Sequence, residues 1–244
     1  MSLRHSGVAA IIIIVLIIIV IITIIAKSSA NENDGKNIEG DNIMVLIAHP
    51  DDEAMFFTPT LVQMKKLGKK LHVICLSNGN YEGLGHKREN ELYLSLSKFN
   101  ITRDNICIGS FTDGPDQDWN TEDIANIIDK YVKKWNIDTI ITFDDMGVSG
   151  HPNHIACFNA TQYYLRDLSP LVNGVALKSV GGIEKFIGPL SLLGSKGSNS
   201  CTLSGYRKAW NQMADHSSQF TWYRKLFIIF SQYSYVNKLD NVRT

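Results

Sequence analysis

The sequence predicts an α/β fold in which a mainly parallel sheet is flanked by helices. Apolar, strand-like runs alternate along the chain with segments of helical character, and short loops join them, as in a succession of right-handed βαβ units. The runs are largely apolar rather than alternating with polar residues, which indicates strands buried on both faces. Strands are expected at 43–48, 71–76, 105–108 and 138–143, and helices at 53–67, 87–99, 121–135 and 151–165.

Each element carries a local signature. The first strand reads IMVLIA, short and rich in residues that favour a buried strand. The helix that follows it is expected to end at Gly68, and the helix that begins at Thr121 is expected to be capped by Asn120 or by Thr121 itself. Residues 173–201 are poor in charge and rich in Gly and Ser, and we expect a strand and a loop there, near the site.

The N-terminus is predicted to form one transmembrane helix. Residues 8–26 read VAAIIIIVLIIIVIITIIA and carry no charge. As a helix they span about 28 Å, close to the roughly 30 Å of the hydrocarbon core. A cleaved signal peptide is the alternative, although its apolar region is usually shorter. We therefore expect an anchor at 1–26, a polar linker at 27–42 and a globular domain at 43–244.

The charge balance argues against a nucleic-acid partner. Lys and Arg together number 24, as do Asp and Glu, so the chain has no basic excess to bind a phosphate backbone. No two cysteines are closely spaced, which argues against a cysteine zinc site. Three of the four fall in predicted strands or helices, which favours reduced, buried thiols in the cytosol. The four are Cys75, Cys107, Cys157 and Cys201.

Polar clusters follow the first and the fourth predicted strands. His49, Asp51 and Asp52 come directly after the first strand, and His151 and His154 follow the fourth. In a parallel sheet these points lie at the carboxyl ends of the strands, where α/β proteins place their sites. His49, Asp52 and His154 could supply two imidazoles and a carboxylate, a ligand set for Zn²⁺ that leaves a position open for water. Asp51 would then be left to accept the proton of that water.

Taken separately, each cluster has a simpler explanation. Two histidines at i, i+3 share a helix face and are often surface or capping residues. Acidic residues at the start of a helix are favoured by the helix macrodipole. The coincidence of both clusters, each at the end of a buried strand, is what favours a metal site.

Four segments resemble the PIG-L, or LmbE-like, deacetylase family. The first signature of the family resembles AHPDDEAMFFTPTL at 48–61, and the second resembles GHPNHIA at 150–156. Between them, residues 76–90 (LSNGNYEGLGHKREN) resemble a Gly-rich loop that precedes an Arg and a Glu. The tail at 213–237 resembles that of the N-acetylglucosaminyl-phosphatidylinositol de-N-acetylase branch. The resemblance covers roughly residues 43–238 and implies a Rossmann-like fold and metal-dependent hydrolysis of an acetamide on GlcNAc.

The resemblance also implies roles for individual residues. By position, His49, Asp52 and His154 become the ligands of a divalent metal, with Zn²⁺ the first choice, although Fe²⁺ or Co²⁺ would fit the same donors. Asp51 becomes the general base. His151 becomes the cation or acid that stabilises the oxyanion and protonates the leaving amine.

Two further residues are assigned to the substrate by the resemblance. Arg88 matches an arginine that would meet a phosphate or a sugar hydroxyl. His216 falls in the tail motif, where substrate binding competes with a capping or packing role. Asn153 stands where many relatives carry an acid, and an asparagine there can still orient a neighbouring ligand.

The expected activity is de-N-acetylation of N-acetylglucosaminyl-phosphatidylinositol (GlcNAc-PI) in GPI-anchor biosynthesis. The resemblance implies a location at the endoplasmic reticulum membrane, a cytosolic catalytic domain and a glycolipid substrate. The predicted N-terminal helix makes this a single-pass protein, and the charge balance leaves no nucleic acid among the expected partners. Alternatives are a deacetylase of a soluble GlcNAc conjugate and a non-catalytic glycolipid-binding protein. The aromatic-rich stretch at 222–235, with its two basic residues, is expected either to pack in the core or to lie at a membrane interface.

Overall fold

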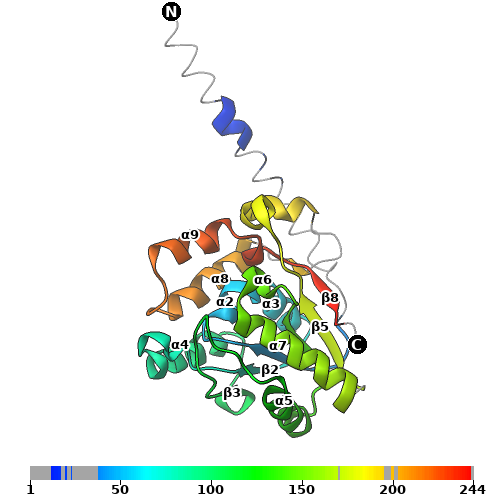
Figure 1. The fold of residues 1–244 in the computed structure, drawn as a ribbon. Helices are drawn as coiled ribbons and strands as arrows, with labels where there is room; N and C mark the ends of the chain where they lie inside the picture. The colour runs from blue at the N-terminus through cyan, green and yellow to red at the C-terminus, as the bar shows by residue number, and fades with distance from the viewer. Residues whose placement is uncertain are drawn as a thin grey trace, which may run out of the picture.

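The computed structural model describes residues 12–17, 20, 23, 38–169, 171–194, 199–200 and 203–242. Its centre is a six-stranded sheet in the order β3-β2-β1-β4-β5-β8 (Figure 1). The first five strands in this order are parallel, and β8 pairs antiparallel with β5 at the edge. The strands are β1 Asn42–Ile47, β2 Lys70–Cys75, β3 Ile106–Ile108, β4 Thr139–Phe143, β5 Asn173–Leu177 and β8 Leu239–Asn241.

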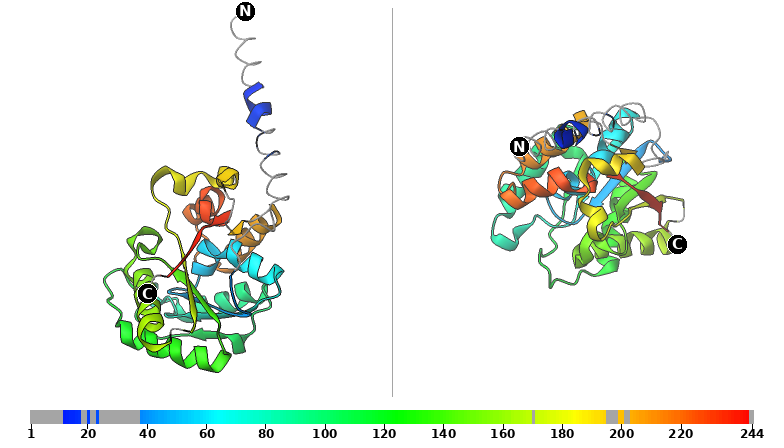
Figure 2. Two further views of the ribbon diagram at one scale, coloured as in Figure 1. Left: turned by 90° about the vertical axis from the view of Figure 1, so that its right-hand side faces the viewer. Right: turned by 90° about the horizontal axis from the view of Figure 1, so that it is seen from above.

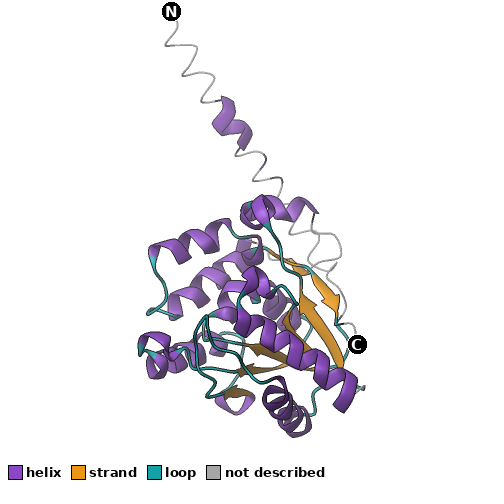
Figure 3. Ribbon diagram, viewed as in Figure 1, coloured by secondary structure: helices purple, strands orange, loops and turns teal. Residues whose placement is uncertain are grey.

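Helices cover both faces of the sheet (Figures 2 and 3). Helices α5 and α7 pack against each other on one face, and α8 contacts both α3 and α4 on the other face. The predicted α/β fold with a mainly parallel sheet is therefore confirmed. The α-helices around the sheet and the site are α2 Asp52–Phe56, α3 Thr58–Lys66, α4 Gly85–Ser97, α5 Thr121–Trp135, α7 Pro152–Tyr163, α8 Leu203–Asp215 and α9 Trp222–Phe230.

The core explains why the sheet forms where it does. Strand β4 is fully buried, β1 and β2 are buried at every residue but the first, and β5 is buried over its last three residues. Burial of such apolar surface is the main stabilising term of the fold. Asn120 caps α5 by accepting hydrogen bonds from the backbone N–H groups of Glu122 and Asp123, so it is Asn120 rather than Thr121 that serves as the cap.

Two predicted helices differ from those observed. The helix expected at 53–67 is broken at Phe57 into α2 and α3. The break fits Pro59, which lacks an N–H and is tolerated only in the first turn of a new helix. The helix expected from residue 151 begins at Pro152, with His151 as its N-cap, and α7 continues into a π-helical turn, η3 (Tyr164–Leu168).

The edge strand β8 and a small second sheet were not predicted. The second sheet pairs β6 (Asn199–Ser200) with β7 (Val236–Asn237). These strands are two or three residues long, too short to show a periodic pattern, and they form because the tail folds back across the sheet.

Most of the predicted anchor (1–26) and linker (27–42) lies outside the described residues. Residues 12–17 are helical. Within the part of the chain that the structure describes, no helix is both long and apolar enough to cross a membrane. Cys75, Cys107 and Cys157 are free thiols, and Cys201 lies outside the described residues.

Candidate metal centre and active site

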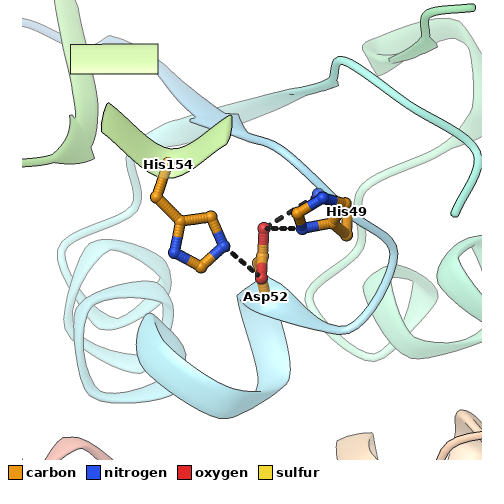
Figure 4. A group of neighbouring side chains, drawn as sticks. All are labelled: His49, Asp52 and His154. Carbon is orange, nitrogen blue, oxygen red and sulfur yellow. Dashed lines mark hydrogen bonds and ion pairs between the residues drawn. The ribbon is translucent and has the colours of Figure 1, made fainter. Parts of the chain in front are cut away.

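His49, Asp52 and His154 converge at the carboxyl ends of two neighbouring strands (Figure 4). His49 follows β1, Asp52 begins α2, and His154 lies in the first turn of α7, beyond the end of β4. One ligand atom from each lies within 4.8 Å of the others. Asp52 Oδ1 is 3.2 Å from His154 Nε2, and Asp52 Oδ2 is 3.7 Å from His49 Nδ1. The structure thus brings together the three side chains that the sequence singled out.

The Asp52 carboxylate is held in one orientation by the backbone. Its Oδ2 accepts hydrogen bonds from the N–H groups of Ala48 and His49, at 3.0 and 2.8 Å. Burial alone would raise the pKa of Asp52, but the facing imidazoles of His154 and His49 hold it well below its usual range. Asp52 is therefore a preoriented anion facing two imidazoles.

His154 directs its Nε2 toward the same point. Its Nδ1 lies 3.1 Å from the carbonyl oxygen of Gly147, to which it can donate, and its ring stacks on Phe143 at 4.0 Å between centroids. In the tautomer with the proton on Nδ1, the buried Nε2 faces Asp52 Oδ1 at 3.2 Å, a contact that lacks hydrogen-bond geometry. A lone pair facing a carboxylate is unfavourable unless a proton or a metal cation lies between them. The donor set therefore fits a divalent metal ion.

His49 is oriented by two residues on its other side. Its Nε2 lies 3.1 Å from Asp113 Oδ1 and 3.0 Å from Asn153 Oδ1. Burial alone would lower the pKa of His49, but these contacts with Asp113, together with those of Asp52, raise it to about 10. A histidine that binds a metal through one ring nitrogen commonly donates a hydrogen bond to a carboxylate from the other. Asn153 orients His49, as the sequence suggested an asparagine there could.

Asp51 lies in an unusual backbone conformation beside two guanidinium groups. Its φ of 129° is rare for a residue with a side chain, and its own N–H donates to Glu53 Oε2 at 3.2 Å. Asp51 Oδ2 forms an ion pair with Arg224, and Oδ1 lies 3.4 Å from Arg88. The predicted base is thus in the site with both oxygens facing positive charge.

His151 lies beside the two histidine ligands. Its ring centroid is 4.9 Å from that of His49 and 4.7 Å from that of His154. Burial, together with the charges of His154 and His49, lowers the pKa of His151 to about 4. Its Nδ1 accepts a hydrogen bond from the N–H of Asn153, which leaves the proton on Nε2. His151 is therefore a neutral hydrogen-bond donor at neutral pH, so of the cation or acid that the resemblance implied, a cation is disfavoured in this structure.

Arg88 lines the site but is largely engaged by the protein. It donates to the carbonyl oxygens of Gly79 and Pro50, at 3.0 and 2.8 Å, and lies 3.6 Å from Asp113. These bonds hold the Gly-rich loop against the end of β1. Only the part of the Arg88 side chain that lines the cavity is available for the predicted contact with substrate.

His216 does not line the cavity, and its buried position favours the packing role over direct contact with substrate. Its side chain is 0% exposed, and its Nε2 lies 2.6 Å from Glu53 Oε1. Burial alone would lower the pKa of His216, but the charge and hydrogen bond of Glu53 raise it. Ser95 donates to the same Glu53 oxygen at 2.6 Å. His216 therefore anchors Glu53, and through it the turn that carries Asp51.

A cavity of about 310 Å³ opens over the cluster. Its polar walls include the metal-ligand candidates together with Asp51, His151 and Asp113, and its apolar walls include Phe56 and Tyr81. Sequence reasoning missed Asp113 and Arg224. Asp113 follows β3, so the rule that sites lie at the carboxyl ends of strands would have found it. Arg224 lies in the C-terminal tail, and no motif in the neighbouring sequence marks it as a site residue.

A parallel α/β sheet with a His–Asp–His cluster in a cavity at its carboxyl edge places the chain among hydrolases with a candidate metal centre. The chain belongs to the PIG-L family: residues 44–165 match the family model described as GlcNAc-PI de-N-acetylase. The chain is 36% identical over 229 residues to the probable N-acetylglucosaminyl-phosphatidylinositol de-N-acetylase of Schizosaccharomyces pombe, covering 87% of this chain and 92% of that protein. It is 35% identical over 212 residues to the N-acetylglucosaminyl-phosphatidylinositol de-N-acetylase of Bos taurus, covering 82% and 83%.

Solved structures share the fold at low sequence identity. The N,N'-diacetylchitobiose deacetylase of Pyrococcus horikoshii superposes with a TM-score of 0.61 at 15% identity, covering 82% of this chain and 83% of that one. A teicoplanin deacetylase in a zinc-inhibited form superposes with a TM-score of 0.59 at 11% identity, covering 82% and 98%. At these identities the likeness concerns the fold.

Proposed function

We propose that this protein hydrolyses the N-acetyl group of GlcNAc-PI, giving glucosaminyl-phosphatidylinositol and acetate, in GPI-anchor biosynthesis. Membership of the PIG-L family and the names of its relatives support this substrate. The observation that carries the proposal is the convergence of His49, Asp52 and His154 on one point of an open cavity. A purely lipid-binding protein would have no need of this arrangement.

The proposed cofactor is a divalent metal ion held by His49, Asp52 and His154. Bound there, it would lower the pKa of a water ligand toward about 7 and polarise the acetamide carbonyl. Zn²⁺ suits this donor set, and Fe²⁺ and Co²⁺ suit it too. Asp113 and Asn153 would keep the His49 ring in place while the ion is bound.

The remaining residues of the site have roles that follow from their positions. Asp51 is placed to accept the proton of the attacking water once one of its oxygens is released from Arg224 or Arg88. The Nε2–H of His151 would donate to the oxygen that becomes negative when the carbonyl is attacked. The proton taken up by Asp51 is then available to the departing glucosamine nitrogen, and acetate is released.

The proposed location is the endoplasmic reticulum membrane, with a single N-terminal anchor and a cytosolic domain. The apolar sequence at 8–26 and the lipid nature of the proposed substrate support it. Asn100 and Asn159 begin Asn-X-Thr sequons, and both side chains are exposed. We expect neither to be glycosylated in cells. A glycan on either residue would place the domain in the lumen.

The deciding experiment is acetate release from GlcNAc-PI by the full chain, with chelator and metal add-back. We expect the activity to be lost with chelator and restored by one of the three ions. His154→Ala should abolish both stoichiometric metal and turnover, whereas His86→Ala should change neither, because His86 is an exposed residue outside the cavity. Turnover of a soluble GlcNAc conjugate but not of the lipid would favour the alternative deacetylase, and metal binding without any acetate would favour a binding protein.

A further inference from the structure

Helix α9 carries an exposed apolar face on the side away from the core. Its exposed large side chains include Trp222, which is 73% exposed, and the neighbouring segments η4 (Gly182–Phe186) and η5 (Gly188–Gly194) add others, among them Ile183 at 88%. We call this set the α9 surface. Its members are Trp222, Tyr223, Leu226, Phe230, Ile183, Phe186 and Leu190. Exposed apolar groups gathered in this way commonly mark an interaction site.

The parts of the α9 surface adjoin one another. The ring of Phe186 lies 6.4 Å from that of Phe227 on α9, edge to face. Gly188, at the start of η5, lies so close to the last turn of α9 that an added Cβ would be 3.2 Å from the carbonyl oxygen of Ile229. Figure 2 shows η4 and η5, in yellow, beside α9, in orange-red. The exposed side chains therefore form one surface rather than scattered residues.

The opposite side of α9 packs against the core and lines the cavity. Ile228 is fully buried, and the ring of Phe227 packs on that of Phe56 at 5.9 Å. Arg224 points into the cavity, where it pairs with Asp51. Because α9 forms a wall of the cavity, whatever covers its outer face lies beside the mouth of the candidate active site.

We propose that the α9 surface rests on a lipid bilayer at the level of the headgroups. Trp and Tyr, whose rings are apolar with one polar edge, favour this level, and the exposed Lys225 beside them suits an anionic membrane surface. The described N-terminal residues 12–17 project beyond the same end of the domain (Figures 1 and 2), so a bilayer that holds them would face α9. The choice of a bilayer as the occupant rests on the proposed function, because a lipid-linked substrate must be presented to this cavity from a membrane.

The first test measures contact with lipid without using activity. The full chain is reconstituted in phosphatidylcholine–phosphatidylserine vesicles whose lipids carry a shallow doxyl quencher, and tryptophan fluorescence is compared with that of Trp222→Phe. The other described tryptophans, Trp119, Trp135 and Trp210, are buried or half-buried. We expect Trp222→Phe to remove more than half of the lipid-dependent quenching. Equal quenching of the two proteins, or no quenching, would overturn the proposal.

The second test separates docking from chemistry. Leu226→Glu places a charge in the α9 surface, and Leu168→Glu is its matched control, since Leu168 is 48% exposed at the end of η3 and Leu226 is 45% exposed. We expect Leu226→Glu to lower turnover of GlcNAc-PI in vesicles about tenfold while leaving turnover of deacylated, water-soluble GlcNAc-phosphoinositol unchanged. Leu168→Glu should change neither.

Other outcomes have distinct meanings. Equal effects of the two substitutions, or an equal loss on both substrates, would overturn docking through α9. A dimer in lipid-free solution that Leu226→Glu dissociates would assign the surface to a second copy of the chain instead, and would also overturn the proposal. If Trp222 is quenched by lipid but no protein releases acetate from either substrate, the docking inference stands and the proposed function fails.

Discussion

Arg224 in α9 forms an ion pair with Asp51 in the turn before α2, although 173 positions separate them in the sequence. Of the two guanidinium groups beside Asp51, that of Arg224 is the more accessible, with 21% of its side chain exposed against 9% for Arg88. Arg88 already donates to two backbone carbonyl oxygens. Arg224 is therefore the cation that an anionic substrate can reach from the cavity.

Replacing Arg224 should weaken recognition of the phosphodiester. Loss of a charge-assisted hydrogen bond costs about 1.5–3 kcal/mol, so we expect Arg224→Gln to lower kcat/KM for GlcNAc-PI by roughly tenfold to a hundredfold. Phosphate-free GlcNAc-inositol should be affected much less, and Arg224→Lys should recover part of the loss. Steady-state kinetics on both substrates provide the measurement. An equal loss on both would mean that Arg224 serves only to hold Asp51.

Asp51→Asn should separate proton transfer from metal binding. The amide keeps the shape of the carboxylate but cannot accept the proton of water, so we expect kcat to fall by roughly a hundredfold to ten-thousandfold. Bound metal, measured by elemental analysis, should stay stoichiometric because Asp51 is not one of the converging ligands. Asp145→Asn, at an exposed aspartate outside the cavity, is the control. Wild-type kcat in Asp51→Asn would remove Asp51 from the mechanism.

The sequence predicted the parts of the fold and site whose signals are local. Strands such as β1 and β4 are short buried runs, and their polar ends carry His49 and His154, so the sheet and the cluster were both foreseeable. The pairing of Arg224 with Asp51 was not, because nothing around residue 224 distinguishes a helix that closes a cavity from one that packs in the core. The choice between the two roles of His216 was left open for a similar reason: its burial against Glu53 depends on how the tail folds back.

His216→Ala should destabilise the fold rather than impair substrate affinity directly. It would leave the Glu53 carboxylate fully buried without its charged partner, and breaking such a pair costs about 3–5 kcal/mol. His216→Gln can still donate to Glu53 and should cost less. Chemical denaturation measures the loss, and KM is measured at a temperature where both variants are folded. A raised KM in a variant of unchanged stability would restore the substrate-binding role.

Gly79→Ala should displace the side chain of Arg88. Gly79 has a φ of 70°, and an added Cβ would lie 2.5 Å from Arg88 Cζ. Gly83 has nearly the same backbone conformation, with a φ of 75°, but an added Cβ there meets nothing within 4 Å. We expect Gly83→Ala to cost about 1–2 kcal/mol from backbone strain alone. Gly79→Ala should cost about 1–3 kcal/mol more from the clash and should also reduce activity. If Gly79→Ala and Gly83→Ala lost the same stability and the same activity, the loop would be shown to accommodate the Cβ at Gly79 without displacing Arg88.

His72 should make the protein less stable as the pH falls from about 6.5 to about 4. It is fully buried in β2 and stacks on Trp135, and neither ring nitrogen has a hydrogen-bond partner among the described residues. Burial, with a smaller effect of the Lys70 charge, lowers its pKa to about 4. As the pH falls, His72 is therefore protonated in the unfolded chain before it is protonated in the folded one. The free energy of unfolding decreases by up to about 3 kcal/mol over this range. His151 acts in the same direction, so the measurement is the difference between the unfolding free energies of wild type and His72→Leu at each pH. That difference should change across this window, and a constant difference would contradict the prediction.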